Sequence, residues 1–165
     1  MRKVILFCCW LFSFALSQAQ LTIDIGEIDT CTSSAITVDV PIVANQAVDL
    51  TALQFTFFWD GSGLSFNSIS TSLVPDPTYG PNFGSPQGDT LTVVWSGSNI
   101  NGLSFDAGDT LFLVNFTITN PTAGNQYDIS QYAGSNSNYP SPLAGGPFLS
   151  SLNLAVNPGY VAVAD

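Results

Sequence analysis

Apolar and polar residues alternate along much of this chain, and this period of two is the feature that most constrains its fold. Successive side chains of a β-strand point to opposite faces, so one phase of such a run marks a buried face. In the run LQFTFFW the apolar phase holds Leu53, Phe55, Phe57 and Trp59. Runs rich in β-branched and aromatic residues predict strands at 21–28, 35–44, 51–59, 64–73, 90–96, 110–119, 126–130 and 151–164.

No segment shows the 3.6-residue period of an amphipathic helix, and turn residues separate the runs at short intervals. Two connections, 75–89 and 134–147, concentrate Pro and Gly and are long for a compact domain, which makes them candidate binding loops. Many short strands with long excursions predict an all-β fold. We expect a two-sheet antiparallel jelly-roll sandwich of about nine strands.

The first 19 residues have the organisation of a secretory signal peptide. Arg2 and Lys3 form a positive segment, and an apolar stretch follows that is too short to span a bilayer as a helix. Small residues at Ser17 and Ala19 place the expected cleavage after Ala19. We therefore expect an exported protein with residues 1–19 removed and residues 20–165 folded as a single domain.

Charge separates this chain from most enzyme classes. Arg2 and Lys3 are its only basic residues and it has no His, so residues 20–165 keep 12 acidic side chains and a formal side-chain charge of −12. Such a segment has no Ser-His-Asp triad, no Schiff-base lysine and no histidine ligand for zinc. It cannot neutralise phosphate, which argues against nucleic-acid partners. We expect no catalytic residues, no membrane span and no cofactor.

Two minor features keep alternatives open. Asp60, Asp106 and Asp109 fit turn-forming roles, and calcium ligation is the alternative for them. Cys31 is the only cysteine after residue 19. It is expected to be a buried or semi-buried thiol, with an intermolecular disulfide as the alternative.

Four ordered segments resemble a known family, the cohesin domains. They are ITVDVPIVANQAVDLTALQFTFFWDGSGLSFNSI (36–69), GDTLTVVWSG (88–97), GLSFDAGDTLFLVNFTIT (102–119) and NPGYVAVAD (157–165). The resemblance implies a non-catalytic nine-stranded jelly roll. It also implies that the chain docks a protein partner, of dockerin type, on a sheet with the family's strand order 8-3-6-5, in extracellular adhesion or scaffolding linked to polysaccharide degradation.

The resemblance assigns 51–59 as strand 3, 90–96 as strand 5 and 110–119 as strand 6, which places 110–119 between the other two. Period two then sends Trp59, Trp95 and the residues in phase with them inward, and Leu111 outward. The expected partner-binding face is Gln54, Thr56, Phe58, Val94, Leu113 and Asn115. Its apolar members Phe58, Val94 and Leu113 form a patch ringed by polar residues, as interaction sites often are.

Other interpretations of these residues remain open. The 75–89 loop could cover Phe58, or the ring could be exposed without a role. A carbohydrate-binding module is the alternative function, with Tyr79, Phe83, Tyr132 and Tyr139 as candidates for stacking on sugar rings. A self-assembling surface or structural protein is a further alternative, because a sparsely charged chain has little except its shared negative charge to keep copies apart.

Overall fold

The computed structural model describes residues 20–31, 36–71, 73, 88–132, 143–146 and 151–164. The described residues are built from β-strands, which confirms the all-β prediction. No helix among them is long and apolar enough to cross a membrane. The predicted signal peptide, 1–19, lies outside the described residues. The strands are β1 (Gln20–Ile25), β2 (Glu27–Thr30), β3 (Thr37–Ala44), β4 (Val48–Leu50), β5 (Ala52–Trp59), β6 (Leu64–Thr71), β7 (Thr90–Ser96), β8 (Leu103–Phe105), β9 (Thr110–Ile118), β10 (Gln126–Gln131), β11 (Leu143–Gly145), β12 (Ser151–Asn157) and β13 (Gly159–Val163).

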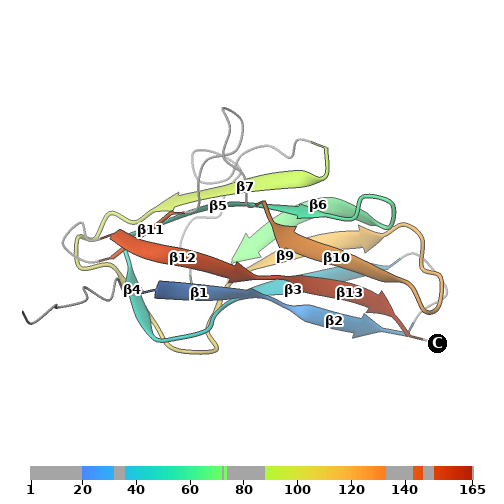
Figure 1. Cartoon of the computed structure of the whole chain (residues 1–165), viewed down its shortest axis with the longest axis horizontal. Helices are drawn as coiled ribbons and strands as arrows, with labels where there is room; N and C mark the ends of the chain where they lie inside the picture. Colours follow the sequence, from blue (N-terminus) through green and yellow to red (C-terminus); the bar gives the residue numbers. More distant parts are fainter. Residues whose placement is uncertain are drawn as a thin grey trace, which may run out of the picture.

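The strands form two layers (Figure 1). One layer, the β9 sheet, has the order β6-β9-β3-β1, and the other, the β5 sheet, has the order β7-β5-β10-β13-β2. Strand β12 links the two layers, because it pairs in parallel with β1 and antiparallel with β11, which in turn pairs with β5. Strands β4 and β8 form a separate antiparallel pair. This is the predicted jelly-roll sandwich, with more short strands than the nine expected.

Two predicted strands each divide where the chain passes from one layer to the other. The 21–28 run breaks at Gly26 into β1 and β2, and the 151–164 run breaks at Pro158 into β12 and β13. The breaks pack together: a Cβ on Gly159 would lie 2.3 Å from the Gly26 carbonyl oxygen. The two segments pass from one layer to the other side by side. They therefore pair in parallel before the break, β1 with β12, and again after it, β2 with β13.

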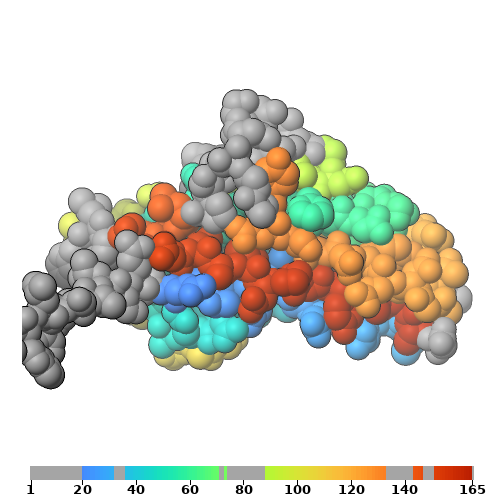
Figure 2. Space-filling model, in the orientation of Figure 1, coloured from blue at the N-terminus to red at the C-terminus, as the bar shows by residue number. Residues whose placement is uncertain are grey.

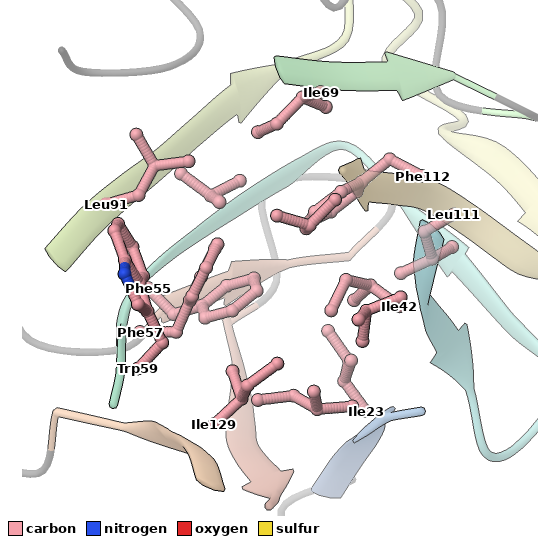
Figure 3. Packing of buried hydrophobic residues seen from close by; sticks show 14 of the residues in the cluster. Ile23, Ile42, Phe55, Phe57, Trp59, Ile69, Leu91, Leu111, Phe112 and Ile129 are labelled. Atoms are coloured by element: carbon pink, nitrogen blue, oxygen red, sulfur yellow. The ribbon is translucent and has the colours of Figure 1, made fainter. Parts of the chain in front are cut away.

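The core lies between the layers and confirms the predicted inward phase. Phe55, Phe57 and Trp59 of β5 are at most 4% exposed, and Trp95 of β7 is 3% exposed. Rings meet across the layers: the Trp59 and Phe116 centroids are 5.3 Å apart in an edge-on contact. Figure 3 shows β5 side chains pointing towards Phe112, Ile42 and Ile23 of the facing strands. Interlocked rings of this kind hold the two sheets at a fixed separation.

Two predictions about the 110–119 strand are wrong. First, β9 does not lie between β5 and β7; it pairs with β3 and β6 in the other layer, while β5 pairs directly with β7. Second, Leu111 is fully buried rather than outward. The neighbouring β3 residues Ile42 and Val43 pair with Phe112 and Thr110 of β9, so Leu111 is an extra residue in a bulge. A bulge reverses the phase of one side chain, which lets Leu111 and Phe112 both enter the core (Figure 3).

Candidate functional site

The outward residues of β5 belong to a sheet face that extends on both sides of this strand. Strand β7 pairs along the whole of β5 on one side. On the other side β11 pairs with its beginning and β10 with its end. Directly opposite residues of paired strands share a face, so the pairing register identifies the neighbours of each outward residue.

Phe58 is the large exposed ring of this face. It is 41% exposed, and its cross-strand neighbours are Thr90 of β7 and Ser130 of β10. Gln54, further along β5, lies between Val94 of β7 and Leu143 of β11. Leu143 is 47% exposed. Two exposed apolar side chains therefore lie on one face, with Thr, Ser and Gln around them.

A shallow hollow of about 410 Å³ adjoins Phe58. Its lining consists of Phe58, Trp59, Asp89, Thr90 and Tyr132. The backbone N–H of Tyr132 donates to the Thr56 carbonyl oxygen at 2.8 Å, which ties the residue after β10 to the middle of β5. We call Phe58, Val94, Tyr132 and Leu143 the outer patch.

Thr56, which was predicted to contact a partner, is only 1% exposed. Its hydroxyl lies 2.9 Å from the hydroxyl of Thr92, the opposite residue on β7. Paired hydroxyls satisfy each other in a buried site, where an unpaired one would be costly. Thr56 therefore supports the face rather than offering a contact.

Leu113 and Asn115 do not lie beside Phe58, because their strand belongs to the other layer. On the outer face of the β9 sheet, the Asn115 amide donates to Asp39 at 2.7 Å and its oxygen accepts from Asn67 at 2.8 Å. The Asn67 amide also donates to Thr117 at 2.9 Å. We call Asp39, Asn67, Asn115 and Thr117 the polar ladder. The predicted patch was thus composed of residues from two opposite faces.

The β5 sheet continues beyond β10 into an acidic region that the sequence reasoning missed. Across β10, β13 and β2 the outward residues Asp128, Tyr160 and Glu27 stand directly opposite one another. Asp29 faces the same way, two residues along β2. The negative charges of Asp29 and Glu27 raise the pKa of Tyr160, and a hydrogen bond from the phenol to Glu27 adds to the effect. A hollow of about 270 Å³ lies among Glu27, Asp128 and Tyr160.

The candidate calcium ligands have turn roles in the structure. An Asp60 carboxylate oxygen accepts from the Ser62 N–H at 2.9 Å, and one of Asp109 accepts from the Asp106 N–H at 2.7 Å. Hydrogen bonds from Ser62 lower the pKa of Asp60. Within the described residues, no three His, Cys, Asp or Glu side chains gather as a metal site would require.

The remaining predicted residues divide into two groups. Tyr132 lies at the outer patch, whereas Tyr79, Phe83 and Tyr139 lie outside the described residues, as do most of the loops that carry them. Cys31 is exposed, contrary to the predicted burial. It follows Thr30, the last residue of β2 to pair with β13, and so lies beyond the end of the sheet.

The fold defines a class, the two-sheet jelly-roll sandwiches. No family model and no curated protein matches the chain. Solved structures do match it. The sixth cohesin of scaffoldin B from Acetivibrio cellulolyticus, solved in complex with a Cel5 dockerin mutant, superposes with a TM-score of 0.67 at 17% identity, covering 88% of this chain and 99% of that one.

Two further structures extend the comparison. The seventh ScaB type I cohesin from Pseudobacteroides cellulosolvens gives a TM-score of 0.68 at 15% identity, over 89% of this chain and 94% of that one. A non-cellulosomal cohesin from the archaeon Archaeoglobus fulgidus gives 0.63 at 19% identity, over 89% and 93%. The chain therefore has the cohesin fold.

The observed pairing also corrects the strand assignment. In the family order 8-3-6-5, the neighbours of strand 3 are strands 8 and 6. The strands that pair with the C-terminal part of β5 are β10 on one side and β7 on the other. Strand β7 therefore takes the place of strand 6 rather than strand 5, and β9 takes no place in that sheet.

Proposed function

We propose that this chain is a non-catalytic docking module that binds a protein partner of dockerin type on the outer face of the β5 sheet. The observation that carries the proposal is Phe58: a large ring, 41% exposed, on β5 with paired strands on both sides of it. The cohesin fold supports it, because cohesins of this fold have been solved in complex with dockerins.

The physical setting of Phe58 suits a protein contact. The β5 strand is flanked by paired strands on both sides and backed by buried rings, so the exposed ring is held on a rigid support. Exposed apolar residues with a polar rim are typical of the centre of an interface, and aromatic anchors often carry most of the binding energy. Leu143 and Val94 extend the contact along the same face.

The test is binding to a panel of dockerins, including the Cel5 and ScaB dockerins of Acetivibrio cellulolyticus, by isothermal titration calorimetry. Phe58→Ser is expected to weaken the tightest of these interactions roughly tenfold or more. Ile100→Ser is the matched control, because Ile100 is 58% exposed and follows the end of β7 that is remote from Phe58. Failure of every dockerin to bind, or equal losses in the two variants, would contradict the proposal.

Carbohydrate binding is the second candidate, and one observation favours it. Phe58 and Tyr132 line one hollow, and planar rings of this kind stack on sugars. Affinity electrophoresis in gels containing soluble glycans, with pull-down on insoluble cellulose and chitin, tests this function. Retardation that Tyr132→Ala removes would support it, and unretarded migration with no pull-down would exclude it for those glycans.

We propose that the module acts outside the cell, in adhesion or scaffolding linked to polysaccharide degradation. Its support is the positive segment and short apolar stretch within residues 1–19. Expression of the full chain with mass spectrometry of the exported product is expected to show a new N-terminus at Gln20. Retention of Met1 in an exported or cell-bound product would contradict the predicted cleavage.

A further inference from the structure

The acidic region and the outer patch are parts of one continuous sheet face. From Phe58 the register runs to Ser130 of β10; two residues earlier on β10, Asp128 faces Tyr160 of β13, and Tyr160 faces Glu27 of β2. Neighbouring strands are about 4.8 Å apart, so the three steps from β5 through β10 and β13 to β2 place Glu27 roughly 15 Å across the sheet from Phe58. Figure 2 shows β10, β13 and β2 side by side on the face turned to the viewer.

One partner can span both regions. A standard protein interface buries about 800 Å² on each side, which is a patch roughly 30 Å across. A molecule centred on Phe58 therefore also covers Asp128, Tyr160 and Glu27. Whatever docks on the outer patch must present suitable chemistry to these carboxylates, since burying an uncompensated charge is costly.

The described residues supply no cation to these groups. The only basic residues of the chain are Arg2 and Lys3. Among the described residues, Asp128 accepts from the neutral Gln126 amide at 2.8 Å, and Glu27 accepts from the Tyr160 hydroxyl. Three carboxylates face the same way across β10 and β2, and the raised pKa of Tyr160 reflects the negative charges of Asp29 and Glu27 beside it.

We infer that the partner docking on the outer patch carries Lys or Arg side chains that lie over Glu27, Asp29 and Asp128. This inference rests on the proposed docking function. It names the partner's chemistry: an apolar centre placed on Phe58 and a basic flank towards β2. Rim charges of this kind steer association and fix orientation more than they add affinity.

Two other occupants fit less well. A second copy of this chain has no basic residue after residue 19 to place over the acidic region. A divalent ion needs several convergent oxygens, and the described residues contain no group of three potential metal ligands. Both remain outcomes of the test below.

The first arm of the test uses the dockerin that binds most tightly in the panel. The variant Glu27→Gln/Asp29→Asn/Asp128→Asn is expected to bind roughly tenfold more weakly at low salt, and to lose most of the wild-type decrease in affinity as NaCl is raised. The matched control is Asp39→Asn/Asp49→Asn/Asp106→Asn, which removes the same charge from exposed positions outside the strands of the β5 sheet. It is expected to bind like the wild type.

The second arm does not depend on a dockerin. The probe is an amphipathic peptide of about four helical turns with Leu on one face and Lys along one flank, compared with a peptide whose Lys residues are Gln. We expect saturable NMR shifts at Glu27, Asp128, Tyr160 and Phe58 with the Lys peptide, at roughly tenfold lower concentration than with the Gln peptide. Calcium chloride alone and self-dilution series serve as the remaining probes.

The outcomes separate the two proposals. If Phe58→Ser weakens dockerin binding while the acidic variant binds like the wild type, the docking function stands and the inference is wrong. If no dockerin binds but the Lys peptide is preferred at these residues, the dockerin assignment fails and the basic-partner inference stands. If the acidic variant and its control lost affinity equally, the effect would come from the net charge of the protein and not from these three positions, and the inference would be wrong. Shifts with calcium alone or with self-dilution at these residues would replace the partner by an ion or a second copy.

Discussion

On the outer face of the β9 sheet the polar side chains bond to one another, whereas on the outer face of the β5 sheet large apolar side chains are exposed. The polar ladder links three strands through Asp39, Asn115 and Asn67 at 2.7 and 2.8 Å. The outer patch has exposed Phe58 and Leu143 instead. Groups that already bond to one another offer little to a partner, while exposed rings gain by being covered.

We expect the opposite faces of the sandwich to have two different tasks, stability on one and binding on the other. The ladder uses its outward residues to hold neighbouring strands together, as cross-strand pairs do. The β5 face holds its strands through the backbone hydrogen bonds and the Thr56–Thr92 hydroxyl pair, which leaves its larger outward residues available. Substitutions on the two faces should therefore change different measurable quantities.

The largest effect on stability is expected from a substitution in the core between the two sheets, not from one on either outer face. Phe55 is fully buried, and its ring centroid lies 6.4 Å from that of Phe112 in the facing sheet. Phe55→Ala is expected to lower the free energy of unfolding by about 3–5 kcal/mol, because it removes buried area and leaves a cavity. Urea denaturation followed by tryptophan fluorescence measures the loss. A loss below about 1 kcal/mol would show that the sheets are not held together by this contact.

The next effect separates the faces directly. Asn115→Ala removes the hydrogen bonds to Asp39 and Asn67 and is expected to cost about 1 kcal/mol of stability without changing partner binding. Phe58→Ser is expected to show the reverse: unfolding changed by about 0.5 kcal/mol or less, and binding weakened. Denaturation and calorimetry on both variants test the pair. If Asn115→Ala weakened binding as much as Phe58→Ser, the division of tasks between the faces would be wrong.

The faces of individual strands were predictable from the sequence because period two is a property of the backbone. It identified Leu53, Phe55 and Phe57 as inward and Phe58 as outward, and all four predictions are confirmed. It failed at Leu111, where a bulge adds one residue to β9 and reverses the phase. A bulge leaves no mark in the alternation itself, since Leu is equally acceptable on either side of it.

The neighbours of each strand were less predictable, because alternation does not encode which sheet a strand joins. The family resemblance assigned the strand of Leu113, β9, to the family position next to β5. The observed pairing gives that position to β7, so Leu113 does not lie beside Phe58. Leu143 was missed because β11 has three residues, too few to show a period, within a stretch rich in Pro and Gly.

The acidic region was missed for a different physical reason. Glu27, Asp128 and Tyr160 are far apart in the sequence and meet only through the parallel pairing of β2 with β13 and the antiparallel pairing of β13 with β10. The parallel pairing depends on the crossing at Gly26 and Gly159, where the two chain segments pack closely. No local pattern reports such long-range contacts.

The smallest expected effect concerns the turn that joins the two faces, since β5 and β6 on either side of Asp60 belong to different sheets. The Ser62 hydroxyl and N–H bond to the Asp60 carboxylate and lower its pKa below the ordinary 3.8. A pKa that is lower in the folded protein contributes stability above pH 3.8, and this contribution is lost as the pH falls through the folded-state pKa.

Asp60→Asn keeps an oxygen that can accept from the Ser62 N–H but cannot titrate, so the fall in unfolding free energy in this acid range should become shallower. Ser62→Ala removes only the hydroxyl and should bring the pKa of Asp60 part of the way back towards 3.8. Carbon-detected NMR titration of Asp60, with denaturation at several acid pH values, measures both. An Asp60 pKa at or above 3.8 in the wild type would show that the turn does not hold its carboxylate in this way. The backbone bonds from Gly63 and Leu64 to the Asp60 carbonyl would then hold the turn.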